Sequence, residues 1–291
     1  MPTVKAVVSV FGQDQKGVVA RFATYLAERG VNILDLEQQV ASGTFLMDML
    51  VDLGEMSLTL DELIPGLLGE GDAIGMTVKV ALQNENRRPR VAVLVTKERH
   101  CLDELVDRWK AGDLRGDLCC VLGNHPDLET VAKEAGLPFA SYPSTNKEEH
   151  FAWIEENLAE FNADCVALAR YMQIVPPRLV KAFPHRIINI HPSLLPHFPG
   201  ASPYKRAWEA GVRVAGCTAH YVTEDLDEGP IILQDVFTID VGRDSADDVK
   251  HNGQALEGKI LADALAMHLD EKLVVVGDKV VFRPGLSAML G

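Results

Sequence analysis

Asn189 and His191 are polar residues in a short run of isoleucines, "IINIH" at positions 187–191. β-branched residues without polar alternation predict a strand that is buried on both faces of a sheet. A polar group inside such a strand must be hydrogen-bonded, because burying it unpaired costs a few kcal/mol. The two residues are therefore either structural residues with hydrogen-bond partners or part of a functional site. In a functional site their N–H groups could stabilise an oxygen that gains negative charge.

Four prolines follow this strand in the stretch "PSLLPHFPGASPY" at 192–204. They are Pro192, Pro196, Pro199 and Pro203. They predict a long, stiff loop that continues neither as strand nor as an early helix. Ligands of open α/β folds bind at the carboxyl edge of the sheet, where this loop leaves the strand. The pattern therefore favours a site.

The composition argues against several classes of protein. The chain has 291 residues, enough for two cores, and 47% are hydrophobic. No apolar stretch reaches the roughly 18 residues of a membrane span, and residues 1–10 lack a signal-peptide pattern. We therefore expect a cytoplasmic protein with no membrane partner. Five cysteines without C-x-x-C spacing predict neither disulfides nor a zinc site, and the net charge of -14 argues against a nucleic-acid partner.

Two blocks of different pattern are joined by the polar, charged stretch "LQNENRRPR" at 82–90. We expect a first domain over residues 1–84, a linker over 85–90 and a second domain over 91–291.

The first block has the order βαββαβ, which is typical of a ferredoxin-like unit. Its expected elements are strand Lys5–Phe11, helix Gly17–Glu28, strands Val31–Gln39 and Thr44–Asp52, helix Leu58–Leu68 and strand Met76–Leu82.

The second block alternates strands and helices, which predicts an α/β, Rossmann-like domain with a mostly parallel sheet. Its expected elements are strands Val91–Val95, Leu118–Gly123, Cys165–Ala169 and Ile187–Ile190, helices near 102–110, 127–135 and 147–159, strands Gly216–Val222 and Ile231–Ile239, a helix over Ser245–His268 and a hairpin at Gly277-Asp278.

The first block resembles an ACT domain, a small regulatory module that often binds amino acids, through "GQDQKGVVARFATYLAERGVNILDLEQ" at 12–38. The resemblance implies an effector site at Asp14 and Gly17, in the turn into the first helix, and at Asn32, which starts the next strand. Exposed amides at a helix start favour a carboxylate. Alternatively, Asp14 caps the helix, Gly17 serves a tight turn, Asn32 is a loop residue and the domain only oligomerises. ACT modules commonly pair, so a homo-oligomer is expected.

The second block resembles the catalytic domain of folate-dependent formyltransferases over about residues 90–285. The resemblance rests on Asn189, "HPSLLP" at 191–196, Gly200, "GCTAHYV" at 216–222 and "DLDEGPIILQ" at 225–234. It implies that Asn189, His191 and Asp227 carry the chemistry. Singly, each would more often be a structural residue, and Asp227 a turn residue before Gly229. Their joint match favours the catalytic interpretation.

The chemistry of a formyl group explains these residue types. Attack on a formyl carbon builds negative charge on its oxygen, which the amide N–H of Asn189 and an N–H of His191 can stabilise. A carboxylate near the imidazole favours its charged form and orients it. Either His191 or Asp227, directly or through a water, can accept the proton of the nucleophile. The leaving N10 of tetrahydrofolate must gain a proton, which the same His and water network can supply.

The resemblance also implies a folate pocket built mainly from backbone groups on two loops. Its residues are Met172, Gln173, Ile174, Glu224, Asp225 and Leu226. Alternatively, Met172 and Ile174 belong to the hydrophobic core. His220, in "TAHYV", is interpreted as a structural or supporting residue and not as a metal ligand, because no His, Cys or carboxylate cluster accompanies it in the sequence. We expect no metal and no cofactor, since 10-formyltetrahydrofolate would be the substrate.

The acceptor of the formyl group separates the remaining interpretations. Glycinamide ribonucleotide transformylases carry a phosphate loop "GNGSNL" where this chain has "KERHCL" at 97–102. The glycines that let backbone amides cradle a phosphate are absent, so a phosphate-bearing acceptor is disfavoured. We expect Arg99 and His100 to fill the acceptor end of the cleft instead. Methionyl-tRNA formyltransferases add a basic C-terminal domain, whereas this sequence is strongly acidic, so we expect no tRNA acceptor.

Over its whole length the chain resembles the formyltetrahydrofolate deformylase family. The resemblance implies hydrolysis of 10-formyltetrahydrofolate to tetrahydrofolate and formate, which supplies purine synthesis and balances the one-carbon folate pool. Deformylases often read "HHSFLP" where this chain reads "HPSLLP" at 191–196, as the transferases do. Formyl transfer to a small amine and a non-catalytic folate sensor therefore remain as alternatives.

Overall fold

The computed structural model of the chain describes residues 4–41, 43–83, 87–196 and 202–283. These residues form two compact units. The first unit has two segments, the described residues up to Arg87 and those from Val281 onward. The second unit is Arg88–Val280. Each unit has its own sheet and its own hydrophobic core.

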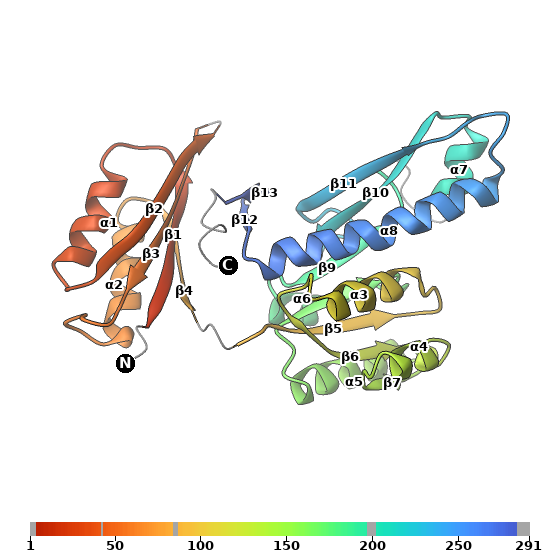
Figure 1. Cartoon of the computed structure of the whole chain (residues 1–291), viewed down its shortest axis with the longest axis horizontal. Coiled ribbons are helices and arrows are strands. Elements are labelled where there is room, and N and C mark those ends of the chain that lie inside the picture. Colours follow the sequence, from red (N-terminus) through yellow and green to blue (C-terminus); the bar gives the residue numbers. More distant parts are fainter. Residues whose placement is uncertain (1–3, 42, 84–86, 197–201, 284–291) are drawn as a thin grey trace. The chain divides into compact units, whose positions relative to one another are not determined.

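The first unit is an antiparallel sheet of four strands in the order β2-β3-β1-β4, with two helices on one face (Figure 1). Its elements are β1 Lys5–Gln13, α1 Val18–Ala27, β2 Asn32–Ala41, β3 Thr44–Asp52, α2 Leu60–Asp72 and β4 Thr77–Gln83. Alternate residues of β1, Ala6, Val8 and Val10, share one core with Phe22 of α1. This spacing is that of a strand with one face under helices. The ferredoxin-like order βαββαβ predicted from the sequence is confirmed.

The second unit is built on a sheet of seven strands in the order β11-β10-β9-β8-β5-β6-β7. Its elements are β5 Arg90–Val95, α3 His100–Ala111, β6 Asp117–Gly123, α4 Glu129–Glu134, β7 Phe139–Ser141, α5 Lys147–Glu160, β8 Cys165–Ala169, α6 Pro177–Ala182, β9 Ile187–His191, α7 Pro203–Glu209, β10 Val214–Tyr221, β11 Ile231–Thr238 and α8 Ala246–Leu269, followed by the hairpin β12 Leu273–Val276 and β13 Lys279–Phe282. The strands from β9 to β7 are parallel, and β10 is antiparallel to both of its neighbours. The predicted α/β architecture with a mostly parallel sheet is confirmed.

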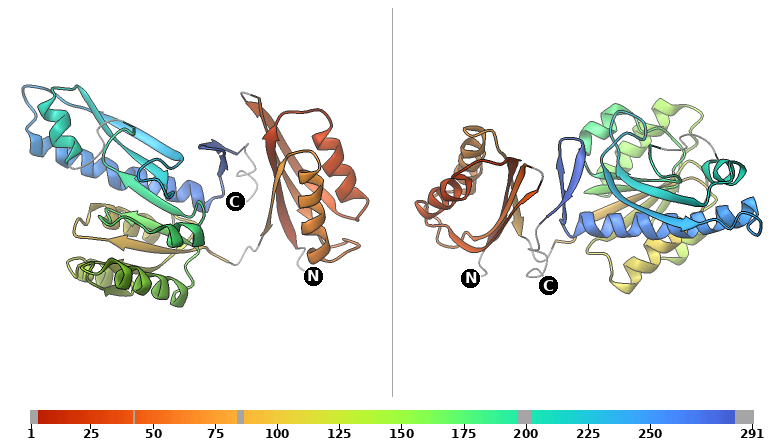
Figure 2. Two further views of the ribbon diagram at one scale, coloured as in Figure 1. Left: turned by 180° about the vertical axis from the view of Figure 1, so that it is seen from behind. Right: turned by 90° about the horizontal axis from the view of Figure 1, so that it is seen from above.

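Helices cover both faces of this sheet with two separate apolar cores. Residues of α3, α4 and α8 pack on one face, where Ile188 and Ile190 of β9 point. Residues of α5 and α6 pack on the other face, with Ile187 of β9 and Leu168 of β8. Figure 2 shows the long helix α8, drawn in blue, lying along the sheet. β9 is therefore covered on both sides, as its isoleucine run predicted.

Three short elements, β7, α6 and α7, were not predicted from the sequence. They have three, six and seven residues, too few for a clear hydrophobic period. Pro203 begins α7 instead of prolonging the loop, because a proline at the first helical position loses no hydrogen bond and already has a helical φ. Pro199 and Gly200 lie outside the described residues.

Helix α8 is the longest described helix, with 24 residues. Ser245 and Asp248 form a capping box at its start, in which the Ser245 N–H donates to the Asp248 carboxylate at 2.9 Å. Neither this helix nor any other in the described part of the chain is long and apolar enough to cross a membrane.

His268, in the last turn of α8, forms a hydrogen bond between its Nδ1 and the Tyr221 hydroxyl of β10 at 2.9 Å. Burial, assisted by the nearby charge of Arg186, lowers the pKa of His268 from 6.5 to about 4. Its folded-state pKa lies below the unfolded value, so the unfolded chain takes up a proton that the folded chain excludes. The free energy of unfolding therefore keeps its full value above about pH 6.5. It decreases as the pH falls toward 4, by at most about 3 kcal/mol in total.

We predict that His268→Asn makes thermal stability less dependent on pH, because an amide can form a hydrogen bond with the Tyr221 hydroxyl without titrating. The melting temperature should fall less between about pH 7 and about pH 5 in this variant than in the wild type. His251→Asn, at an exposed position of the same helix, is the control. Equal pH dependence of the His268 variant and the wild type would contradict the prediction.

Candidate active site

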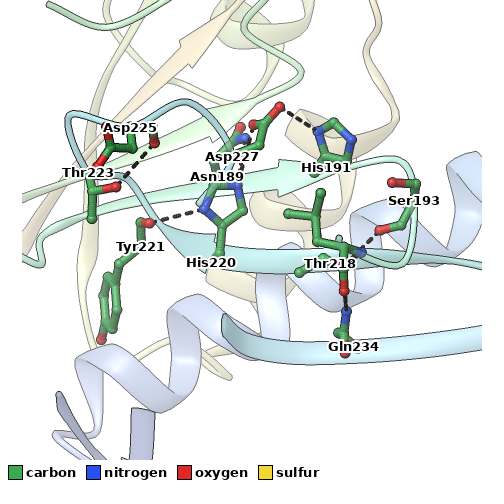
Figure 3. A network of polar contacts seen from close by, with 11 residues as sticks. Asn189, His191, Ser193, Thr218, His220, Tyr221, Thr223, Asp225, Asp227 and Gln234 are labelled. Atoms are coloured by element: carbon green, nitrogen blue, oxygen red, sulfur yellow. Dashed lines mark hydrogen bonds and ion pairs between the residues drawn. The ribbon is translucent and has the colours of Figure 1, made fainter. Parts of the chain in front are cut away.

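Strands β9 and β10 bring four polar side chains to one face of the sheet. In their antiparallel register Asn189 lies opposite His220, and His191 lies opposite Thr218. Directly opposed residues project to the same face, and residues two apart on one strand share that face. Ile188 and Ile190 project to the other face. The register therefore groups the polar residues of "IINIH" with those of "TAHY" (Figure 3).

Asp227 reaches this group from the loop between β10 and β11. Its Oδ2 lies 3.3 Å from Nδ1 of His191, and its Oδ1 lies 3.8 Å from Nε2 of His220. The His191 imidazole, assisted by His220, lowers the pKa of the Asp227 carboxyl, although partial burial opposes the change. The Asp227 backbone has a φ of +58°, a conformation that is uncommon outside glycine. The structure thus brings the three predicted catalytic residues together, and Asp227 is ionised at neutral pH.

His191 has one ring nitrogen without a partner. With Nδ1 directed at Asp227, the other nitrogen, Nε2, is buried and forms no hydrogen bond with any described residue. A buried polar atom without a partner is energetically unfavourable unless a bound ligand forms a hydrogen bond with it. Nε2 can accept a proton when the ring is neutral and can donate one when the ring is charged. His191 therefore offers either state to a bound molecule while Asp227 orients it.

His220 controls the orientation of Asn189. His220 Nδ1 lies 3.0 Å from the backbone oxygen of Tyr221, which can only accept, so Nδ1 carries the proton. Nε2 of His220 is then an acceptor, and the Asn189 amide Nδ2 donates to it at 3.2 Å. Burial lowers the pKa of His220, which favours this neutral form. One N–H of Asn189 is thereby held by His220, and the second is available to a ligand oxygen.

Thr218 and Gln234 hold the loop that follows His191. The Thr218 hydroxyl donates to the Ser193 carbonyl at 2.7 Å and accepts from the Leu195 N–H at 3.0 Å. The Gln234 amide donates to the Thr218 hydroxyl at 2.9 Å and to the Leu195 carbonyl at 3.1 Å (Figure 3). These contacts tie the start of the proline-rich loop to β10 and β11. Thr218 and Gln234 lie in the motifs "GCTAHYV" and "DLDEGPIILQ", but no signal in the sequence predicted this role.

A cavity of about 320 Å³ opens beside these groups. Its lining includes Asn189, His191, His220, Asp227 and all six residues predicted for the folate pocket, Met172, Gln173, Ile174, Glu224, Asp225 and Leu226. The alternative that Met172 and Ile174 are core residues is wrong, because their exposed fractions are 64% and 58%. The Met172 N–H is anchored by the Thr96 hydroxyl at 3.0 Å, which positions this loop.

The three residues predicted for an effector site, Asp14, Gly17 and Asn32, are exposed in the first unit. Gly17 has a φ of +88° and directly precedes α1, which no side chain caps. The alternative that Asp14 caps this helix is therefore wrong. Asn32 begins β2, opposite Asp52 of β3, and is not a loop residue.

The prediction that Arg99 fills the acceptor end of the cleft is wrong. Arg99 is 64% exposed in its side chain and pairs with Asp103 one turn along α3 at 2.7 Å. Its neighbour His100 instead contacts Glu257 of α8 at 3.1 Å. Glu257 also contacts Arg170, which lines the cavity. Neither Arg170 nor Glu257 carried a motif signal in the sequence.

Within the described ranges, His100, Cys101 and Glu257 form a group whose ligand atoms are close enough for a metal ion. The Arg170 guanidinium contacts the same Glu257 oxygen as His100, at 3.2 Å. Burial also raises the pKa of the Cys101 thiol well above its usual value, so it stays protonated. A cation next to a neutral thiol does not fit a metal site.

Comparisons with known proteins define the class of this chain. Residues 5–81 match the ACT domain family, and residues 89–265 match the formyl transferase family. The chain thus consists of an ACT domain followed by a formyl transferase domain.

The relatives define the family more closely. The formyltetrahydrofolate deformylase of Bacillus subtilis is 38% identical over 275 residues, covering 92% of this chain and 90% of that protein. That of Escherichia coli K12 is 35% identical over 274 residues, covering 92% and 94%. A crystal structure of a formyltetrahydrofolate deformylase from Pseudomonas syringae has a TM-score of 0.84 at 33% identity, covering 98% and 96%. The chain belongs to the formyltetrahydrofolate deformylase family.

Solved structures of transferases match a smaller share of the chain. The glycinamide ribonucleotide transformylase 1 of Symbiobacterium toebii has a TM-score of 0.65 at 34% identity, covering 70% of this chain and 97% of that one.

We predict that Thr218→Val destabilises the protein by about 1–3 kcal/mol, since it leaves the buried Leu195 N–H without its acceptor and removes a donor from the Ser193 carbonyl. Thr218→Ser keeps the hydroxyl and is the matched control. Thermal unfolding should give a clearly lower melting temperature for the Val variant than for the Ser variant. Equal melting temperatures would show that the hydroxyl does not hold the loop.

Proposed function

We propose that this protein hydrolyses 10-formyltetrahydrofolate to tetrahydrofolate and formate, supplying formate for purine synthesis and balancing the one-carbon folate pool. The observation that carries the proposal is the unpartnered Nε2 of His191, buried beside Asn189 and Asp227 at a cavity lined by the predicted folate loops. Named deformylases that align with 90% or more of their length support the same activity.

In the proposed reaction, Asn189 and His191 stabilise the oxygen of the formyl group. Water attacks the formyl carbon, and the negative charge that develops on the oxygen is met by the available amide N–H of Asn189. His220 fixes that amide before the substrate arrives. A donor that is already oriented needs no reorganisation during the reaction, so it lowers the barrier.

His191 and Asp227 handle the protons. The attacking water loses a proton to His191 or Asp227, and the charged imidazole is stabilised by the Asp227 carboxylate at 3.3 Å. A bond forms between the water oxygen and the formyl carbon, and the bond from that carbon to N10 breaks. N10 takes up a proton from the same network, and the formic acid that forms releases its remaining proton to solvent and leaves as formate. The reaction needs no cofactor, and the proposal includes no metal.

The pterin is assigned to the loops that carry Met172, Gln173 and Ile174 on one side and Glu224, Asp225 and Leu226 on the other. Leu226 is 62% exposed, like its two apolar counterparts. Exposed apolar side chains at the mouth of a cavity suit a flat aromatic ligand, while backbone N–H and C=O groups of the loops provide polar recognition.

We predict that Asp227→Asn retains folding but loses most turnover, by a factor of about 10² or more, because the amide cannot stabilise the charged imidazole or accept a proton. Asn189→Ala should reduce the rate by about 10² to 10³, the usual effect of removing an oxyanion donor. If the two groups act as a unit, the double variant should lose less activity than the product of the two single rate reductions. Formate release under substrate saturation is the measurement.

Formate release without any added amine also separates the proposed activity from its alternatives. A transferase would need an amine, and a folate sensor would bind 10-formyltetrahydrofolate without turnover. Near wild-type turnover of the Asp227 variant would remove this residue from the mechanism.

For the first unit, we propose an amino-acid effector that binds at Asp14, Gly17 and Asn32, and assembly into a homo-oligomer. The exposed turn before α1 and the ACT domain match support an effector site. An amino acid that binds only the folded protein should stabilise it by about 2.7 kcal/mol at 100 times its Kd.

A thermal-shift screen of amino acids with Asn32→Ala as control tests the effector site, and light scattering tests the assembly. A shift that persists in the Asn32 variant would place the ligand elsewhere. The absence of any shift would leave the unit as an assembly module.

A further inference from the structure

Arg170, the residue after β8, is the centre of an ion cluster that also includes Glu98, Glu257 and His100. Its Nε lies 2.9 Å from a Glu98 oxygen and 3.2 Å from Oε2 of Glu257. His100 Nε2 lies 3.1 Å from the same Glu257 oxygen. The four residues come from the ends of β5 and β8, the start of α3 and the middle of α8. The cluster therefore exists only in the folded chain.

The Arg170 backbone has a φ of +58°, in the left-handed region that favours glycine. Ser202 and Asp227, which also line the cavity, share this conformation with φ values of +53° and +58°. Strained backbone conformations persist where the surrounding structure maintains them, and they concentrate at functional sites. A long cationic side chain at a position that favours glycine indicates that the side chain is needed there.

The charges of the cluster are balanced, and its centre is buried. Glu257 is 1% exposed in its side chain and Arg170 is 16% exposed. Lys250 lies 3.8 Å from Glu98, so two carboxylates face two cations. Displacing Arg170 would leave the buried Glu257 carboxylate uncompensated, which is strongly unfavourable. Gly258 lets α8 approach the start of α3 closely beside the cluster, because a Cβ at this position would lie 3.2 Å from the His100 carbonyl oxygen.

Arg170 belongs to the part of the cavity lining that the proposed function leaves unassigned. The pterin is assigned to the loops at 172–174 and 224–226, and the reaction to Asn189, His191 and Asp227. The other described lining residues outside the strands include Pro192 and Ser202. Among them, Arg170 is the one charged residue. A second substrate larger than water would have to use this part of the cavity.

We infer that Arg170, held by Glu257 and Glu98, selects the formyl acceptor by filling the space that an amine acceptor would need, so that water is the nucleophile. The inference rests on the proposed function and deepens it. An acceptor carrying phosphate would find no free cation in the cluster, since the Arg170 guanidinium is already paired. Water needs neither the space nor a cation.

The two outcomes differ only in the nucleophile. In hydrolysis, the water oxygen bonds to the formyl carbon, the bond to N10 breaks and N10 gains one of the two water protons. The other proton is released to solvent as formate leaves. In transfer, the nitrogen of a primary amine bonds to the formyl carbon, and the proton it loses balances the proton gained by N10. The same oxyanion donors serve both reactions, so access decides between them.

The test removes the guanidinium without leaving a buried charge. The double variant Arg170→Gly, Glu257→Gln relieves the left-handed backbone and keeps an amide that can bond to His100. With 10-formyltetrahydrofolate labelled with carbon-13 in the formyl group and an excess of glycinamide, NMR measures the ratio of N-formylglycinamide to formate. We expect this ratio to rise by about 10-fold or more over wild type, within the range that steric pocket changes produce.

The matched control is Arg99→Gly with Asp103→Asn, which removes the exposed ion pair of α3 and should leave the ratio unchanged. A folded double variant that releases formate with an unchanged ratio would overturn the inference, and so would an equal rise in the control. If the double variant does not fold, Arg170→Gln with Glu257→Gln undergoes the same assay with the same criterion. Absence of formate release by the wild type would instead overturn the proposed function, so the two failures are distinguishable.

Discussion

The antiparallel pairing of β10 with β9 is the constraint on which the candidate active site depends. It places Asn189 opposite His220 and His191 opposite Thr218. A slip of one residue would turn the polar side chains of one strand away from those of the other. The apolar residues between them prevent such a slip, since Ile188, Ile190 and Ala219 are buried in the core under α8. The hydrophobic core of the second unit thus determines the geometry of its polar site.

The neighbouring titratable groups differ in protonation because their surroundings differ. His220 is buried and donates its Nδ1 proton to a backbone carbonyl, so it remains neutral and orients Asn189. Asp227 is stabilised in its charged form by His191. His191 lies between an ionised carboxylate and the cavity, and its Nε2 is the nitrogen left for a substrate. Groups whose surroundings differ in this way can take separate roles in acid–base chemistry.

Proteins named for different reactions are similar in structure to this chain. A deformylase matches 98% of it with a TM-score of 0.84, and a glycinamide ribonucleotide transformylase matches 70% of it with a TM-score of 0.65. The fold therefore does not determine the acceptor, which must depend on the site. In this chain a buried carboxylate of α8 holds an arginine at the cavity wall, and the pair is internally neutralised. A pair of this kind contributes little net stability, which is consistent with a role in specificity.

Sequence alone determined the order and type of the long elements and the residues of the central strand. Hydrophobic periods of 2 and 3.6 residues reflect which faces are buried, so β1 to β4, β5, β6, β8 and β9 were predicted close to their observed bounds. Asn189 and His191 gave a local signal, because they are polar residues in an apolar strand, but the catalytic assignment of both and of Asp227 rested on the resemblance to the folate-dependent formyltransferases. The brief elements β7, α6 and α7 were missed because their patterns are too short.

Only the tertiary structure decided which distant side chains complete the site. Arg99 was expected at the acceptor end, yet it points to solvent, because α3 turns that side away from the sheet and Asp103 lies within reach on the same helix. Arg170 and Glu257 lie far apart in the sequence, and each is an ordinary charged residue in its own segment. They meet because α8 packs on α3 and on the sheet. The local sequence around either residue does not predict this contact. Contacts of this kind follow from the packing of whole elements, which no local pattern records.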